Sequence, residues 1–141
     1  MDYDYREKKT VVVLKANLEL GVAVNVIGHL AVTLSHNAID HMGRELLKDA
    51  SGISHLGVSK YPFIVTKAKE SKIRAALEIA RSDSRILVAD FPRQMLDTKD
   101  DNELYQSLIE TEEANLEYLG AIFFGDTEVL NPITRRFSLY N

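Results

Sequence analysis

The 141-residue chain contains no cysteine. This absence excludes a disulfide framework, a thiol nucleophile and a cysteine metal site. The chain also lacks an apolar run long enough to cross a membrane, and its charged start, MDYDYREKKT, has no apolar core of the kind that a secretory signal needs. We therefore expect a cytoplasmic protein that does not associate with a membrane.

A surplus of positive charge is missing as well. The chain has 17 lysines and arginines against 21 aspartates and glutamates, a formal net charge of −4. The basic residues form only short clusters, at residues 6–9, 67–72 and 135–136. Proteins that bind nucleic acids usually carry a basic surplus or a basic stripe that faces the phosphates. The composition therefore argues against a nucleic-acid partner.

Common catalytic and cofactor motifs are absent too. The sequence has no GxxxxGK[ST] or GxGxxG loop for nucleotide phosphates and no GxSxG nucleophile elbow. His29 and His36 would lie two turns apart on one helix, too far to share a metal ion. We predict no metal and no cofactor. We expect His29 to be partly buried and hydrogen-bonded, and His36, His41 and His55 to lie near the surface.

The hydrophobic pattern predicts one α/β domain over residues 1–141, with residues 1–8 as a tail. KTVVVLK (9–15) is a β-branched run typical of a strand buried on both faces. Further strands are predicted at 63–68, 85–90 and 119–125, and helices from residue 20, over 70–83 and after a capping box at Thr98 with Asp101 in its acidic position. A short helical turn is expected at 126–131. This alternation favours a sandwich with some parallel strand pairing.

The first predicted helix has no charged face between Gly21 and Ser35. A helix that is apolar nearly all round is covered on more than one side. We therefore predict a homodimer in which this helix supplies the interface. The competing explanation is a cover from the same chain, such as a helix within residues 100–115.

The third predicted strand ends at Asp90, and Pro92 and Arg93 follow. In open α/β sheets, ligands bind beyond the carboxyl ends of the strands, so Asp90 is the best candidate for a catalytic group. Capping of the next turn would explain the same carboxylate equally well. If a site is present, the tight turn predicts that Asp90 and Arg93 converge on it.

Three stretches resemble the type-II peptidyl-tRNA hydrolases, in the same order along the chain. They are KTVVVLKANLELG (9–21), YPFIVTKAKESKIRAALEIARS (61–82) and FGDTEVLNPITRRFSLY (124–140). The chain is most similar to a branch of uncharacterised bacterial proteins, the domain of unknown function 2000. This resemblance implies a three-layer sandwich with a mixed four-stranded sheet between helices, often dimeric. It implies no activity by itself.

The resemblance also marks where the hydrolase site has changed. The hydrolases carry a Gly-Lys-Gly-Lys motif at the start of the first helix, and its two lysines correspond to Val22 and Val24 here. The strand-end aspartate of the family matches Asp90, its arginine matches Arg93, and its threonine is replaced by Gln94. We therefore expect the hydrolase fold without peptidyl-tRNA hydrolase activity.

The leading hypothesis is a domain that retains a pocket for a small ligand near the strand ends. One alternative is a true peptidyl-tRNA hydrolase, in which Asp90 orients the attacking water. The other is a non-enzymatic module that acts through self-association. The predicted ligand-binding residues are Lys15, Asn17, Asn25, Asp90, Arg93 and Gln94.

Overall fold

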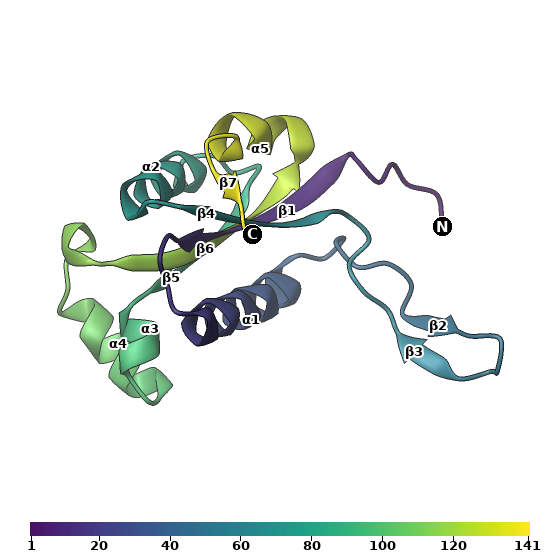
Figure 1. Cartoon of the computed structure of the whole chain (residues 1–141), viewed down its shortest axis with the longest axis horizontal. Coiled ribbons are helices and arrows are strands. Elements are labelled where there is room, and N and C mark those ends of the chain that lie inside the picture. The colour runs from purple at the N-terminus through teal and green to yellow at the C-terminus, as the bar shows by residue number, and fades with distance from the viewer.

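The computed structural model describes residues 1–141, and its helices and strands alternate along the chain (Figure 1). The strands are β1 (Lys8–Lys15), β2 (Leu46–Lys48), β3 (Ser54–Leu56), β4 (Phe63–Ala68), β5 (Leu87–Pro92), β6 (Tyr118–Asp126) and β7 (Ser138–Leu139). The α-helices are α1 (Leu20–Asn37), α2 (Glu70–Arg81), α3 (Gln94–Asp97), α4 (Asp101–Ile109) and α5 (Thr127–Thr134), and η1 (Glu113–Asn115) is a 3₁₀ turn.

Five strands form the main sheet, in the order β5-β6-β1-β4-β7. β1 and β4 pair in parallel, whereas β6 is antiparallel to both β1 and β5, and β7 is antiparallel to β4. Because β5 and β1 both oppose β6, the strands β1, β4 and β5 all run in one direction. Their carboxyl ends therefore lie at one edge of the sheet, together with the start of β6.

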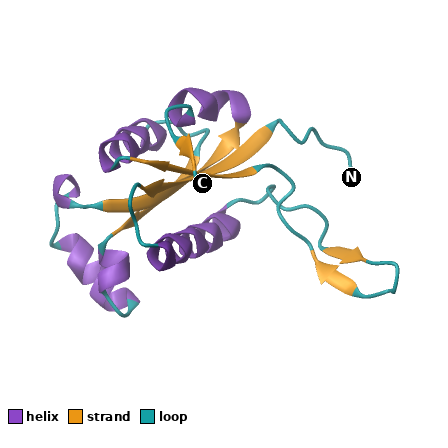
Figure 2. Cartoon of the chain, in the orientation of Figure 1, coloured by secondary structure: helices purple, strands orange, loops and turns teal.

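Helices cover both faces of this sheet (Figure 2). α1 packs on one face, and α2 and α5 pack on the other. β1 is buried on both faces, as its β-branched sequence predicts: Val12 and Leu14 contact the α1 core, and Val13 contacts the α2 core. None of the helices combines the length and the apolar character needed to cross a bilayer.

The structure corrects the sequence-based account of the strands. The main sheet has a fifth strand, β7, which the four-strand prediction lacks. Residues 46–56 form the separate hairpin β2–β3 outside the main sheet. β5 continues through Asp90 to Pro92, because it stays paired with β6 past the residue at which the sequence predicts its end.

The helix that the sequence predicts to start at Thr98 is α4, and it is capped by a different residue. Asp100, not Thr98, precedes the first turn of α4, and its carboxylate accepts a hydrogen bond of 2.8 Å from the backbone N–H of Glu103. Thr98 instead donates its hydroxyl hydrogen bond to the carbonyl of Gln94 at 2.7 Å. Thr98 thus satisfies the carbonyl of the first residue of α3, and Asp100 stabilises the start of α4.

Candidate functional site

A pocket of about 480 Å³ opens at the edge where β1 and β5 end. The loop between β1 and α1 forms one wall, and the turn after β5 forms the other. Such an edge is the usual ligand position in open α/β sheets. The lining residues are Lys15, Ala16, Asn17, Leu18, Glu19, Val22, Arg93 and Leu96.

Glu117 holds the two cations of this pocket together. Its carboxylate accepts from Lys15 Nζ at 2.5 Å, and from Arg93 Nε at 2.7 Å and Nη2 at 3.1 Å. The hydrogen bonds from Arg93 and Lys15 lower the pKa of Glu117 to about 2. The hydrogen bond to Glu117 raises the pKa of Arg93 in turn. Glu117 and Arg93 are therefore both charged at neutral pH.

Both cations keep donors that Glu117 does not use. A lysine ammonium has three hydrogen-bond donors and a guanidinium has five. Glu117 takes one donor from Lys15 and two from Arg93, and neither side chain makes another hydrogen bond or ion pair. Spare donors are thus present at the pocket for an acceptor such as a carboxylate.

The loop that follows β1 is shaped by Asn17. Its φ of +69° makes it the one non-glycine residue with a left-handed backbone, a conformation that asparagine tolerates better than most residues. α1 begins three residues later. Glu19 at its N-cap makes no side-chain hydrogen bond to the first turn, so no side chain caps the N–H groups that start the helix. Asn17 and Glu19 are exposed at the pocket.

Three of the six predicted residues, Asn25, Gln94 and Asp90, lie outside the lining of this pocket. Asn25 is exposed one turn further along α1 than Val22, which does line it. Gln94 follows Arg93 in α3, and its side-chain oxygen Oε1 is buried without a hydrogen-bond partner. The structure thus brings Lys15, Asn17 and Arg93 together, and places Asn25 and Gln94 outside this group.

Asp90 belongs to a different cluster. Side chains alternate across a strand, so the neighbours Ala89 and Phe91 face α1, whereas Asp90 points to the side of α2. There its carboxylate accepts a hydrogen bond of 3.0 Å from Arg81 Nη2. Arg81 also donates to the hydroxyl of Tyr118 at 2.9 Å. Asp90 and Arg93 therefore have no common partner, contrary to the expected convergence.

The cluster around Asp90 is a closed network of charges and hydrogen bonds. The guanidinium carbons of Arg74 and Arg81 lie 4.9 and 5.4 Å from the centre of the Tyr118 ring. Its hydroxyl donates to Glu113 at 2.7 Å, and Glu113 also accepts from Arg74 at 2.8 Å. Burial, followed by this bond to Glu113, raises the pKa of Tyr118. The polar groups of this cluster are hydrogen-bonded to one another, which indicates a structural role in holding α2 against β6.

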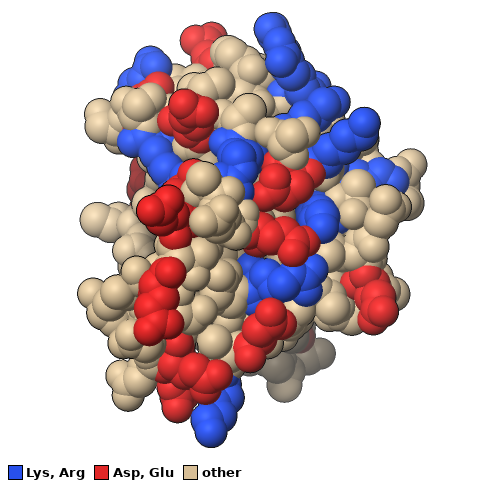
Figure 3. Space-filling model, turned by 90° about the vertical axis from the view of Figure 1, so that its left-hand side faces the viewer, with Lys and Arg blue, Asp and Glu red and all other residues tan.

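The positions that match the hydrolase lysines carry no polar group. Val22 lies in the pocket wall and Val24 is exposed on the outer side of α1. The charged side chains on this end of the molecule are mixed in sign. Figure 3 views the end where β1 terminates, and most of its blue and red atoms alternate, with a small group of lysines and arginines at the upper right. A continuous basic surface is not present on this face.

Two of the four histidines, His29 and His41, differ from their prediction, whereas His36 and His55 are exposed as expected. His29 is exposed and makes no hydrogen bond, and its ring lies 5.9 Å from that of Phe91. His41 is the buried one, with Nδ1 2.7 Å from the carbonyl oxygen of Ala38. Its ring also lies 6.1 Å from that of Phe124 in β6. No three histidine, aspartate or glutamate side chains are close enough to hold a metal ion.

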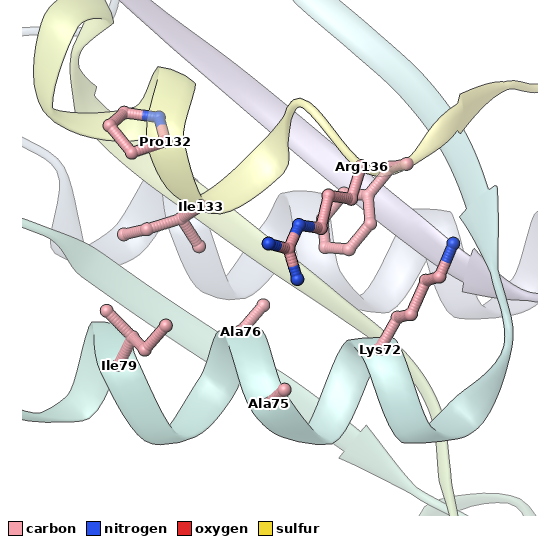
Figure 4. Close-up of a pocket in the computed structure, with 8 residues that line it drawn as sticks. Lys72, Ala75, Ala76, Ile79, Pro132, Ile133 and Arg136 are labelled. Carbon is pink, nitrogen blue, oxygen red and sulfur yellow. The ribbon is translucent and has the colours of Figure 1, made fainter.

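A second hollow lies between α2 and α5 (Figure 4). Alanine, isoleucine, proline and phenylalanine side chains form most of it, and the cations Lys72 and Arg136 stand at one end. Its volume of about 160 Å³ is below the usual range for small-molecule sites. It also lacks polar groups that converge from several sides. We therefore treat the pocket at Lys15 and Arg93 as the candidate site.

Sequence reasoning missed Glu117, although this residue organises the pocket. No motif marks it, because a single glutamate before a strand is common. The signal that could have found it is topological. A strand antiparallel to β1 must begin at the edge where β1 ends, so the residues just before β6 face Lys15.

Comparisons with known proteins agree with this fold. A family model described as "Protein of unknown function (DUF2000)" matches residues 8–141. The structure of a protein of unknown function, Atu0240 from Agrobacterium tumefaciens strain C58, is similar with a TM-score of 0.85. The two chains are 18% identical, and the match covers 96% of this chain and 98% of the other. At that identity the likeness shows the fold alone. No curated protein matches the chain.

Proposed function

The chain belongs to the DUF2000 family of proteins of unknown function, and we propose that it binds a small carboxylate with an apolar portion in the pocket at Lys15 and Arg93. One observation carries this proposal: Glu117 holds two cations side by side at the pocket while leaving each with unused donors. Leu18, Val22 and Leu96 supply the apolar wall. A volume of about 480 Å³ is within the range of known small-molecule sites.

The charge balance of the pocket restricts the net charge that a ligand can carry. Lys15 and Arg93 are offset by Glu117 and Glu19, so the pocket as a whole is close to neutral. A monoanion, or a zwitterion whose amine meets Glu19, fits this balance. A polyphosphate does not, because several negative charges would face the two carboxylates.

A binding experiment tests the proposal with matched ligands. N-acetyl-leucine carries one carboxylate and a branched apolar group, and N-acetyl-leucinamide has the same shape without the charge. These two compounds, and a panel of small carboxylic acids with their amides, are titrated into ¹⁵N-labelled protein. We expect the acids of the panel, and not the amides, to shift the amide signals of residues 15–22.

Two variants and a control locate the site. Lys15→Met and Arg93→Met should each weaken acid binding by about tenfold, the loss of one charged hydrogen bond. Lys8→Met is the control, because Lys8 forms an exposed ion pair with Asp126 at 2.9 Å near the other end of β1. If no acid of the panel binds more tightly than its amide, or if Lys8→Met weakens binding equally, the proposed ligand class is wrong.

We also infer that this chain has a type-II peptidyl-tRNA hydrolase-like fold and lacks peptidyl-tRNA hydrolase activity. A polyanionic substrate needs cations that face its phosphates, and the matching positions are Val22 and Val24. Ester hydrolysis needs a group that activates water, and Asp90 is bonded to Arg81 on the α2 side of the sheet. Incubation with N-acetylated aminoacyl-tRNA should release no deacylated tRNA above the buffer rate. Turnover that Asp90→Asn abolishes would instead favour the hydrolase alternative.

The non-enzymatic alternative has its own supporting observation. Val24 and Val32 are more than half exposed on the outer side of α1, within the stretch that has no charged face. This exposure supports a homodimer through α1. Self-association and ligand binding can occur together, because the stripe that holds Val24 and Val32 faces away from the core and most of it lies beyond the pocket.

A further inference from the structure

The hairpin β2–β3 forms an arm, defined here as residues 44–58, that projects from the body of the molecule (Figure 1). All six residues of its two strands are exposed. The arm nevertheless has a defined shape. Asp49 accepts backbone hydrogen bonds from Ser51 and Ile53 at its tip, and Gly57 N–H donates to the Glu45 carbonyl at its base.

The side chains of the arm are unusually apolar for a projecting hairpin. Leu56 is 80% exposed and Val58 is 68% exposed, and three further apolar side chains, Leu46, Leu47 and Ile53, are also exposed. A two-stranded hairpin alone is marginally stable in water, and contact with another surface stabilises it. Within its own chain the arm has no such contact. It therefore needs a covering surface from outside.

The outer side of α1 offers a surface of matching character. Gly21, Val24, Gly28, Val32 and Ser35 follow one another at helical spacing along it, and all are exposed. A Cβ atom built on either glycine would meet nothing within 4 Å. The strip is therefore narrow, uncharged and open, and a flat hairpin can approach its backbone closely.

The surface area of the chain agrees with an uncovered interface. The exposed surface is 9106 Å². A compact monomer of 15.9 kDa is expected to expose about 7,400 Å². The excess of about 1,700 Å² is about twice the area that each partner buries in a standard protein interface, about 800 Å².

We propose that two copies associate about a two-fold axis, with the arm of each copy lying across the α1 strip of the other. The arm leaves the body near the C-terminal end of α1, on the same side of the sheet as that helix, and extends away from it (Figure 1). Arm and strip on one chain thus do not meet, whereas a two-fold axis brings each onto its counterpart. This arrangement deepens the proposed homodimer and rests on it.

The charges favour a second copy over other occupants. Arg44 and Lys48 are offset by Glu45 and Asp49 in the arm, and the strip carries no charge. A membrane surface or a nucleic acid would be met by a basic excess, which neither surface has. The arm and the strip are both neutral and apolar, so each can cover the other when two copies of the chain associate.

Light scattering on the full-length protein tests the association. We expect a mass twice 15.9 kDa at micromolar concentration for the natural chain. Leu56→Asp in the arm and Val32→Asp in the strip should each raise the dissociation constant about tenfold or more. Ile109→Asp is the matched control, because Ile109 is a similarly exposed apolar residue at the end of α4. Thermal unfolding followed by circular dichroism checks that each variant is folded.

A third variant moves the arm without altering its apolar side chains. Gly57→Ala would place a Cβ atom 1.6 Å from the carbonyl oxygen of Arg44, so the base of the arm must shift. We expect this variant to weaken the dimer as much as Leu56→Asp does, with little effect on the body of the fold.

Cross-linking then distinguishes the arrangement from the dimer itself. The chain has no natural cysteine, so Val32→Cys and Leu56→Cys each introduce a single thiol. A bismaleimide should join the two proteins when they are mixed, and neither protein alone to the same extent. A monomeric natural chain would refute both the dimer and the arm contact. A dimer that survives Leu56→Asp, or one in which Val32→Cys alone cross-links as well as the mixture, would retain the dimer and refute the arm contact.

Discussion

Replacing Glu117 by glutamine removes the carboxylate that pairs Lys15 with Arg93. The change keeps the size of the side chain and takes away three charged hydrogen bonds, of 2.5, 2.7 and 3.1 Å. Exposed ion pairs contribute about 0.2–1 kcal/mol each to the free energy of unfolding. The Arg93 pair has two parallel hydrogen bonds, which places it at the upper end of that range. We therefore expect the free energy of unfolding to fall by about 1–2 kcal/mol at pH 7.

The pKa of Glu117 gives an independent magnitude. A drop from the ordinary value of 4.5 to about 2 corresponds to about 3 kcal/mol at full strength. The Glu117 side chain is 37% exposed, so solvent screening reduces this figure to about 1–2 kcal/mol. The two lines of reasoning agree.

The effect of Glu117→Gln must also depend on pH. The pKa of Glu117 is lower in the folded chain than in the unfolded one, so its stabilisation is fully present above pH 4.5 and is lost as the pH falls toward 2. The difference in unfolding free energy between the natural chain and the variant should therefore shrink across that interval. Urea unfolding at pH 7, 5 and 3 measures it.

A control variant separates this effect from a general loss of negative charge. Glu78 is exposed on α2 and makes no hydrogen bond or ion pair, so Glu78→Gln should change stability by less than about 0.5 kcal/mol. If Glu117→Gln is as stable as the natural chain at pH 7, or if its deficit is the same at pH 7 and pH 3, the assigned role of Glu117 is refuted.

Three further substitutions test other parts of the structure by urea unfolding. Gly120→Ala would place a Cβ atom 2.8 Å from a methyl group of Val26, and the forced shift of α1 against the sheet should cost about 1–3 kcal/mol; unchanged stability would contradict this packing. Asp100→Ala removes the cap of α4 and should cost about 0.5–2 kcal/mol. Asp90→Asn breaks the ion pair with Arg81 and should lower the free energy of unfolding by less than about 1 kcal/mol. NMR titration of this variant should show unchanged acid binding, and a loss of binding would indicate that Asp90 belongs to the ligand site.

The sequence predicts those helices and strands whose apolar residues are spaced so that they form a buried face. β1, β4 and α2 are examples, because their apolar residues repeat at strand or helix spacing and pack into the two core clusters. The hydrophobic pattern does not predict the arm. Its strands have three residues each, and both faces of each strand are exposed, so no alternation marks them. β7 has only two residues, and its place is decided by pairing with β4.

The candidate site was predictable only in part, for a reason that Asp90 illustrates. Sequence patterns place a residue near the end of a strand, but the face it occupies depends on the exact strand end. β5 runs two residues further than predicted, so Asp90 lies within the strand and turns toward Arg81, and Arg93 takes the place beyond it. Lys15 is the last residue of β1, as the sequence predicts, and Asn17 lies two residues beyond it.

Asp90 and Glu117 each pair with an arginine, and the contrast between these two ion pairs explains which cluster can bind a ligand. Asp90 and Arg81 are joined to Glu113 and Tyr118, so each charge there already has a partner within the fold. Around Glu117 a single carboxylate serves two cations, and their donors outnumber its acceptor positions. A ligand carboxylate can therefore join the second cluster without displacing a protein group, whereas at the first it would have to compete with one. The same imbalance predicts that Glu117→Gln, while less stable, binds the acids more tightly.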